Sequence, residues 1–394
     1  MTRIAILVPT IDQIGGAERQ ILLLSKELSL RGWQVAIVAL SGDGAACADA
    51  LKSAGVSYLS LRMRKAWVDP RGWLRYLKWF SRNRPDIVHA HLPHATWFAR
   101  CVRPLASVRV LVGTIHTSST GTTARQLAYR LTNKLTDRVT CVSKSVAAAA
   151  IAARMVPEQN LTILPNGVEM PLSVAKRYLN LTNASSIQPF HWIAVGRLAP
   201  VKDYPTLLRA FAKLSGEPTL QIAGSGPEEH SLRNLASELG IQARVQLLGF
   251  QRDVRPLLAD ADAFVLSSLW EGLPMGVLEA AAAGLPVVAT DGSGTREAMR
   301  LDETGFVVPG GDIAALSHAM TQMMAMPLDR RLKMGENGRQ FVDKHFSLPV
   351  IVDQWQNLYA QLLEENPLPS RHGRGRLLLG KPQSPPDSLQ SDPR

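Results

Sequence analysis

The chain has 394 residues, of which 46% are hydrophobic and 20% charged, the composition of a soluble globular protein. This length exceeds what one hydrophobic core usually supports, so two domains are expected. No run of about 18 apolar residues lacks a charge, which argues against a membrane-spanning helix. The apolar run that follows Met1 is too short for a signal peptide and lacks a cleavage pattern.

The net charge of +11 is unevenly distributed along the chain. Residues 1–172 contain 22 Lys or Arg and 10 Asp or Glu, whereas residues 173–365 contain 17 and 21. A basic first half indicates a polyanionic partner, which could be anionic lipid, nucleic acid or a phosphorylated substrate. The three cysteines, Cys47, Cys101 and Cys141, are an odd number without metal-site spacing, so reduced thiols in a cytosolic compartment are expected.

The first half of the chain alternates short β-type runs with longer helical patterns. The first helical pattern is the plainest, since Ile21, Leu24 and Leu28 share one face and Gly32 follows near its end. Such alternation predicts an α/β fold with a doubly wound parallel sheet. The predicted strands are residues 3–9, 34–40, 56–61, 86–92, 109–116, 138–142 and 161–165.

The alternation breaks in a polar segment that contains Pro171, Asn180 and Asn183, and then resumes. The second set of predicted strands is residues 191–198, 219–224, 245–250, 263–268, 287–290 and 305–308. Two Rossmann-like parallel-sheet domains facing each other across a deep cleft are therefore expected, because open sheets bind ligands beyond the carboxyl ends of their strands. The expected boundaries are 1–172 for an acceptor-side domain, 173–190 for a linker, 191–345 for a nucleotide-sugar domain, 346–365 for a helix packing back on the first domain, and 366–394 for a disordered tail.

The most informative stretch runs from Ser268 to Thr290 and contains Glu271 and Glu279. Gly272 and Pro274 interrupt the helical pattern, so Glu271 is expected on a loop and Glu279 in the helix that follows. The amides at that helix start would bind phosphate, and the two carboxylates would accept hydrogen bonds from sugar hydroxyls. A solvated Glu beside a buried Ala-rich helix is the plain alternative.

This stretch resembles the glutamate–seven residues–glutamate motif of family-4 retaining glycosyltransferases of the GT-B fold. The resemblance extends over about residues 3–345 and implies that Glu279 holds the donor ribose and that Glu271 contacts the transferred sugar. It also implies that the backbone of the intervening turn lines the donor phosphates. That turn consists of Gly272, Leu273, Pro274, Met275 and Gly276.

Two further motifs of the series supply a cationic and a glycine-rich loop. Arg197 and Lys202 follow the first strand of the second domain, where they would neutralise a diphosphate as it leaves. Gly15 and Gly16 lie between the first strand and the first helix, where glycine permits close backbone approach to a ligand. The family resemblance assigns both pairs to the donor phosphates, with acceptor contact as an alternative for the glycines. Taken singly, they would be surface charges and a turn.

Weaker matches complete the series. By the resemblance, His116 lies near the transferred sugar, Gly224 belongs to a phosphate-side loop, and Phe250 belongs to the loop that contacts the base. A lone histidine at the end of a strand is otherwise more often structural. The same holds for His89, His91 and His94, for which structure or acceptor contact is favoured over metal binding.

No metal or other cofactor is expected. Asp260 and Asp262 resemble an Asp-x-Asp metal motif but come directly before a buried strand, where acidic residues commonly mark a junction. Residues 291–297 depart from the usual family sequence, although Glu297 keeps its place, so the resemblance leaves the donor sugar open.

Residues 62–84 form a basic, aromatic segment. Arg71, Arg75, Lys78 and Arg82 share one helical face, whereas Trp73, Leu77 and Phe80 share another. Such a helix suits an anionic membrane surface, and each cation near that surface contributes about 1 kcal/mol. A surface helix that buries its apolar face in the first domain is the equal alternative.

The expected function is that of a retaining, metal-independent glycosyltransferase. It would transfer a sugar from a nucleotide diphosphate, UDP first and GDP next, to a saccharide or lipid-linked saccharide in cell-surface polysaccharide or lipopolysaccharide synthesis. Its expected location is the cytoplasm, peripherally at the inner face of the membrane. A sugar-nucleotide epimerase is the alternative, although no acid–base pair can be assigned. A nucleic-acid partner is not expected, because no recognised nucleic-acid module is present.

Overall fold

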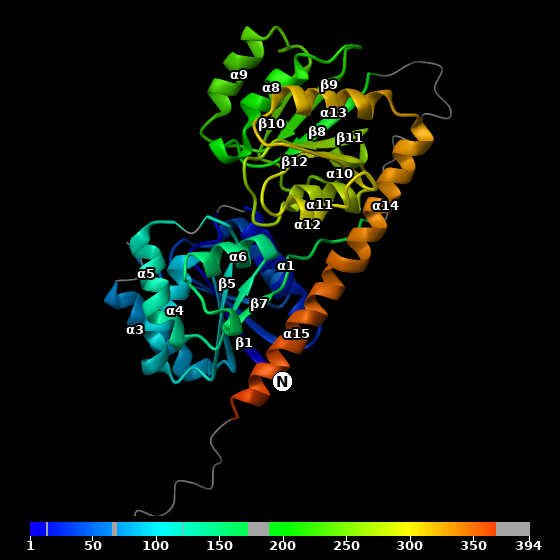
Figure 1. Ribbon diagram of the computed structural model, residues 1–394. Helices are drawn as coiled ribbons and strands as arrows, with labels where there is room; N and C mark the ends of the chain where they lie inside the picture. Colours follow the sequence, from blue (N-terminus) through cyan, green and yellow to red (C-terminus); the bar gives the residue numbers. More distant parts are fainter. Residues whose placement is uncertain (13–14, 65–68, 120, 172–188, 368–394) are drawn as a thin grey trace, which may run out of the picture.

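The computed structural model describes residues 1–12, 15–64, 69–119, 121–171 and 189–367. It contains two parallel β-sheets, one built from the first half of the chain and one from the second, each covered by helices (Figure 1). We call these parts the first and second domains. This is the predicted α/β architecture of two Rossmann-like domains.

The first sheet has seven parallel strands in the order β3-β2-β1-β4-β5-β6-β7. Its order reverses direction beside β1, which is the doubly wound arrangement. The strands are β1 (Arg3–Val8), β2 (Gln34–Ala39), β3 (Ser57–Ser60), β4 (Ile87–His91), β5 (Val110–Ile115), β6 (Arg138–Cys141) and β7 (Leu161–Ile163). The helices are α1 (Gly16–Leu30), α2 (Ala48–Ser53), α3 (Pro70–Asn83), α4 (Pro93–Ala106), α5 (Thr123–Thr132) and α6 (Lys144–Ala152).

The second sheet has six parallel strands in the order β10-β9-β8-β11-β12-β13. The strands are β8 (His191–Val195), β9 (Thr219–Ala223), β10 (Val245–Gly249), β11 (Ala263–Leu266), β12 (Val287–Thr290) and β13 (Gly305–Val308). The helices are α8 (Tyr204–Phe211), α9 (Glu229–Glu238), α10 (Arg255–Ala259), α11 (Met275–Ala282), α12 (Thr295–Ala298), α13 (Ile313–Ala325) and α14 (Leu328–Phe346).

All thirteen predicted strands are present, most of them one to three residues shorter than predicted. The predicted run 191–198, for example, ends as a strand at Val195, and Gly196 already belongs to the following loop. The loops at these carboxyl ends carry the predicted site residues. Most of the predicted linker, residues 173–188, and of the predicted tail, residues 368–394, lie outside the described residues.

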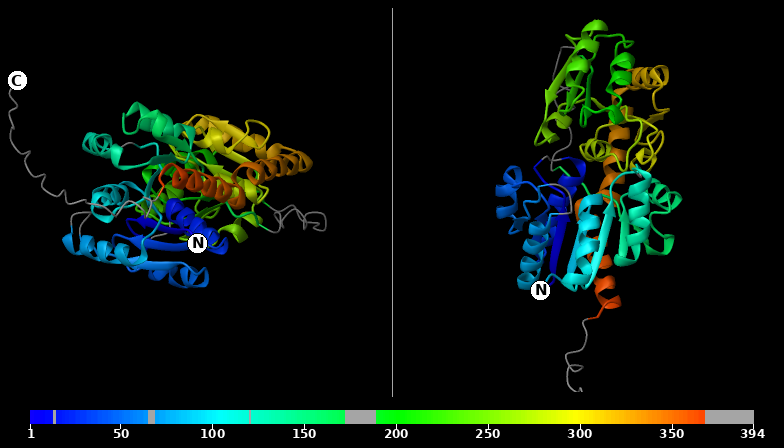
Figure 2. Two further views of the ribbon diagram at one scale, coloured as in Figure 1. Left: turned by 90° about the horizontal axis from the view of Figure 1, so that it is seen from below. Right: turned by 90° about the vertical axis from the view of Figure 1, so that its left-hand side faces the viewer.

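The last helix, α15 (Leu348–Glu365), connects the two domains along one side of the molecule. It continues from α14 and descends beside the first sheet (Figures 1 and 2). Its buried side chains Leu348, Ile351 and Trp355 share one hydrophobic cluster with Ile21 and Leu24 of α1. The burial of this apolar face, rather than helix propensity, fixes the chain end on the first domain.

Candidate active site

The carboxyl-terminal loops of the two sheets meet where the sequence places the site. An ion pair of 3.0 Å joins Arg19 Nη1, on α1 of the first domain, to Glu279 Oε1, on α11 of the second. Gly16, at the start of α1, faces Met275 at the start of α11, since a Cβ on the glycine would lie 3.6 Å from Met275 Cγ. The glycine loop and the glutamate motif therefore face each other, and the domains are in direct contact here.

Glu271 lies on the loop after β11 and is held by two partners from its own domain. Its Oε1 accepts hydrogen bonds from Ser268 Oγ, at 2.7 Å, and from Lys202 Nζ. The side chains of Glu271 and Lys202 are only 14% and 18% exposed. A carboxylate in a low-dielectric site needs such a partner. Lys202 would therefore have to be shared between Glu271 and a bound diphosphate.

Glu279 lies on α11, as predicted, and is nearly buried, with 10% of its side chain exposed. Burial raises the pKa of its carboxyl group, and the positive charge of Arg19 opposes that shift. Pro274 precedes the first turn of α11 and leaves the amides of Met275 and Gly276 at the helix start. A buried carboxylate beside helix-start amides suits a ligand that has both hydroxyl groups and negative charge.

The remaining second-domain positions follow the carboxyl ends of three neighbouring strands, β8, β9 and β10. Arg197 is exposed directly after β8. Gly224 has φ +153°, and a Cβ there would lie 1.9 Å from the carbonyl oxygen of Gly196, so only glycine permits this loop to pack against the Arg197 loop. Phe250, which follows β10, is 56% exposed. Its ring is therefore available to a ligand.

His116 follows β5, is half-buried and contacts the buried residues His91 and His89. Its Nε2 lies 2.9 Å from His91 Nδ1, and the rings of His91 and His89 are 3.9 Å apart. His89 is hydrogen-bonded through Nδ1 to the Tyr359 hydroxyl, at 2.7 Å, and through Nε2 to Thr114. Burial lowers the pKa of His116 to about 4 and that of His89 to about 3. These two rings are therefore neutral at pH 7.

His94 lies close to His89 and His91 in the sequence, but in the structure it makes a ring contact with Trp97 on α4. Asp262 accepts a 2.7 Å hydrogen bond from the backbone amide of His191, which explains the carboxylate before β11 as structural. Within the described residues, no three His, Cys, Asp or Glu side chains come together as a metal site. Metal independence stays a prediction.

The structure adds contacts that are not visible in the sequence. Arg19, Ser143 and Glu297 cross between the domains, and Tyr359 reaches His89 from α15. Arg19 comes three residues after Gly16, but no feature of the sequence indicates its partner in the second domain. Tyr359 is 270 residues away from His89, so only the tertiary structure reveals this pair.

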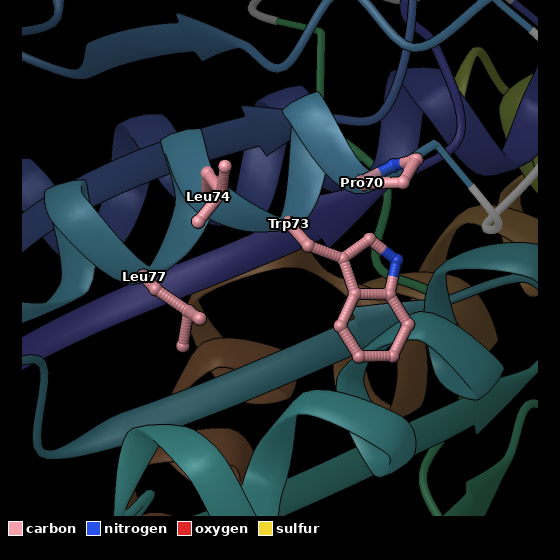
Figure 3. A pocket seen from close by; sticks show the side chains of 4 residues that line it. All are labelled: Pro70, Trp73, Leu74 and Leu77. Atoms are coloured by element: carbon pink, nitrogen blue, oxygen red, sulfur yellow. The ribbon is translucent and has the colours of Figure 1, made fainter.

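Helix α3 carries both the basic and the apolar face that were predicted for residues 62–84. Tyr76 and Phe80 are buried in the first domain, and Trp73 and Leu77 pack partly against the same cluster. Leu74 is 68% exposed and, together with Pro70, Trp73 and Leu77, lines an open apolar hollow (Figure 3). The four cations of the basic face, Arg71, Arg75, Lys78 and Arg82, are exposed. Within the described residues, no helix is long and apolar enough to span a membrane.

Two Rossmann-like domains that meet around paired carboxylates, cations and a helix start define the GT-B class of glycosyltransferases. The sequence matches the family described as Glycosyltransferase Family 4 over residues 14–170 and the family described as Glycosyl transferases group 1 over residues 185–341. Together the two matches span most of the chain, and the protein belongs to glycosyltransferase family 4.

Relatives of known name support this membership. The chain is 27% identical over 318 residues to the UDP-Gal:alpha-D-GlcNAc-diphosphoundecaprenol alpha-1,3-galactosyltransferase of Escherichia coli, over 75% of this chain and 80% of the relative. It is 37% identical over 175 residues to the lipopolysaccharide core biosynthesis glycosyltransferase LpsE of Rhizobium meliloti, over 44% of this chain and 50% of LpsE.

Solved structures show the same fold. The HepE protein of Anabaena in complex with UDP and glucose aligns with a TM-score of 0.78 and 19% identity, over 92% of this chain and all of that one. Sucrose-phosphate synthase of Thermosynechococcus elongatus aligns with a TM-score of 0.79 and 19% identity, over 93% of this chain and all of that one. At this identity the likeness concerns the fold alone.

Proposed function

We propose that this glycosyltransferase uses a UDP-sugar as donor, retains the anomeric configuration and needs no metal ion. The contact of Glu279 with Arg19 carries the proposal, because it places a buried carboxylate next to a cation from the opposite domain. On donor binding, the ribose hydroxyls would donate hydrogen bonds to the Glu279 carboxylate in place of Arg19, and Arg19 would pair with the diphosphate. We choose UDP as the nucleotide of the donor because the Escherichia coli relative is named for UDP-Gal and the HepE structure contains UDP.

The proposed reaction is a same-face displacement assisted by the leaving group. The bond from the anomeric carbon to the donor phosphate breaks, and a bond from that carbon to the acceptor oxygen forms on the same face. The proton of the acceptor hydroxyl passes to the leaving diphosphate. Arg197, Lys202 and the amides of Met275 and Gly276 would stabilise the charge that develops on that diphosphate, in place of a metal ion. His116 and Glu271 would contact the transferred sugar.

Thermal unfolding with UDP, GDP, ADP or CMP, each in the presence of EDTA, tests the donor assignment. A ligand at 100 times its dissociation constant adds about 2.7 kcal/mol to the free energy of unfolding. UDP should therefore raise the unfolding temperature clearly, and Glu279→Ala should abolish that rise. Glu303→Ala removes an exposed carboxylate on the same domain and should leave the rise intact. The donor assignment fails if folded wild-type protein responds to none of the four nucleotides.

We propose a lipid-linked saccharide as acceptor, in cell-surface polysaccharide or lipopolysaccharide synthesis. The named acceptor of the Escherichia coli relative, a sugar diphosphoundecaprenol, supports this choice, as does the basic first domain. Transfer of radiolabelled sugar from UDP-sugars to sugar-diphospholipid acceptors, compared with free saccharides, tests it. Equal turnover of both acceptors would argue against a lipid-linked substrate.

We also propose that α3 binds the inner face of an anionic membrane, which would place the enzyme peripherally in the cytoplasm. The exposed Leu74 and the open apolar hollow would meet acyl chains, and the four neighbouring cations would meet lipid headgroups. Sedimentation with anionic liposomes at low salt should recover the wild type in the pellet. Arg75→Glu combined with Lys78→Glu should prevent this, whereas Arg233→Glu on α9 should not. Equal sedimentation of all three proteins would refute the membrane role of α3.

The expected domain limits, 1–172 and 191–345, are also kept as a proposal. Limited proteolysis should cut first between them, in residues 173–190, because compact domains protect their backbone from cleavage. Early cleavage inside either domain would contradict these limits. The epimerase alternative gains no specific contact from the structure, and family membership favours transfer.

A further inference from the structure

The start of helix α6, in the first domain, faces the Glu271 loop and α12 of the second domain. Lys144 N donates a 2.7 Å hydrogen bond to Glu297 Oε2, and Ser145 N donates a 2.9 Å hydrogen bond to Glu297 Oε1. One carboxylate from the second domain thus accepts from two successive amides of a first-domain helix. A negative charge at this position also interacts favourably with the helix dipole.

Ser143 makes a second bridge at the same helix start. Its Oγ accepts from Val146 N at 3.2 Å, which caps α6, and donates to the carbonyl oxygen of Gly272 at 2.6 Å. Ala147 N is bonded to the carbonyl oxygen of Ser143 at 3.0 Å. All of the first four helical amides of α6 are therefore satisfied, two of them only through the other domain.

The elements that contact α6 are also joined to each other inside the second domain. Gly294 N, at the start of α12, donates a 3.3 Å hydrogen bond to the carbonyl oxygen of Glu271. A Cβ on Gly294 would lie 2.1 Å from the carbonyl oxygen of Gly272, so α12 packs directly on the Glu271 loop. A change in the position of Glu297 therefore also moves the loop that carries Glu271.

We propose that Glu297 is the closure residue of this enzyme: its carboxylate docks on the start of α6 and holds the Glu271 loop against His116 in the closed state. The proposal rests on the proposed transfer function, which requires both domains to enclose the reacting sugar. When the domains separate, Glu297 and the two amides of α6 exchange these hydrogen bonds for hydrogen bonds to water. The net free energy of this exchange is modest, so the contact favours the closed state but still permits opening. Glu297 acts as a positioning residue, because none of its contacts involves Glu279, Lys202 or Arg197.

The test compares Glu297→Ala with Glu303→Ala, the same change at an exposed carboxylate whose ion-pair partner is its neighbour Arg300. Three quantities are measured on the full chain: the dissociation constant of UDP, kcat for sugar transfer, and the radius of gyration in solution with saturating UDP. Hydrogen bonds to a charged group are strong enough for their loss to reduce kcat about 10-fold to 100-fold. Glu297→Ala should show this loss and a larger radius of gyration.

The UDP dissociation constant of Glu297→Ala should stay within about twofold of wild type, because the proposed donor contacts remain. Glu303→Ala should match wild type in all three quantities. A Glu297→Ala enzyme with unchanged kcat and unchanged radius of gyration overturns the proposal, and so does a loss confined to UDP affinity. If Glu297→Ala fails to fold, Glu297→Asp, which keeps the charge but shortens its reach, is judged by the same criteria.

Failure of the proposed function is distinguishable from failure of this inference. If wild-type protein transfers no sugar from any UDP-sugar, the donor assignment fails, and the radius of gyration alone then decides on closure. A larger radius for Glu297→Ala without ligand supports the closure role, and an equal radius overturns it.

Discussion

Replacing Gly272 by alanine should separate donor binding from sugar transfer. A Cβ at this position would lie 2.2 Å from the carbonyl oxygen of His116 and 3.3 Å from Thr117 Cα, both in the first domain. The backbone of Gly272 is not in the left-handed region, so alanine causes no strain within its own loop. The added methyl group therefore acts on the contact between the domains and not on the folding of the second domain.

The size of the effect follows from this geometry. Ordinary van der Waals contact begins near 3.4 Å, so the new Cβ at position 272 and the carbonyl oxygen of His116 must move apart by about 1.2 Å. Displacements of about 1 Å in a reacting geometry reduce rates by about 100-fold, which corresponds to about 2.7 kcal/mol. We expect kcat of Gly272→Ala to fall by about this factor, while the unfolding temperature stays close to that of wild type.

Steady-state transfer kinetics and calorimetric titration with UDP measure the two halves of this prediction. UDP affinity should change less than about threefold, because the methyl group points toward the first domain. Gly310→Ala is the matched control, since a Cβ there meets nothing within 4 Å. If Gly272→Ala retains kcat within threefold of wild type, the close contact between the Glu271 loop and His116 is not part of the reacting state.

Three further predictions follow from the buried polar contacts. The pKa of His89 is lowered to about 3, so this side chain stays neutral in the folded protein and takes up a proton on unfolding below about pH 6.5. Its contribution to the free energy of unfolding is therefore full above about pH 6.5 and decreases toward pH 3 by up to about 1.4 kcal/mol per pH unit. In urea unfolding of His89→Phe between pH 4 and 7, the dependence of the free energy of unfolding on pH should be smaller by about one proton, and an unchanged dependence would contradict this. Tyr359→Phe removes the 2.7 Å bond to His89 and should lower the free energy of unfolding by about 1–3 kcal/mol, measured by urea titration at pH 7; a change below about 0.5 kcal/mol would show that this bond does not hold α15 in place. Lys202→Ala should weaken UDP binding at least about 10-fold in calorimetry. The change removes a cation that is proposed to bind the diphosphate and leaves Glu271 without its ion-pair partner. Unchanged affinity would show that Lys202 does not belong to the donor site.

The sequence was sufficient for the sheets and for the helix that carries Glu279. Buried parallel strands are short apolar runs between helical patterns, so each strand is visible locally, and only the limits of most strands differ, by one to three residues. Pro274 likewise marked the start of α11 through its own backbone restriction. The order of the motifs along the chain was enough to indicate the family.

The sequence left open whether the apolar face of α3 contacts a membrane or is buried in the first domain. A basic amphipathic pattern is the same for a helix on a membrane and for a helix on a protein core. The structure shows Tyr76 and Phe80 in the core and Leu74 exposed, so the protein covers most of the apolar surface of α3 and leaves one strip uncovered. Contact of that strip with a membrane stays a prediction.

The contacts between the domains could be found only in the tertiary structure. Arg19 is 260 positions from Glu279 and Ser143 is 129 positions from Gly272, and the sequence around each residue predicts only its local helix or turn. Helices and strands depend on backbone propensity and apolar periodicity, and a few neighbouring residues determine both. The partner of a buried charge depends on how the two folded domains pack against each other. The sequence therefore predicted which residues to expect at the site, and the packing of the two domains decided which of them touch.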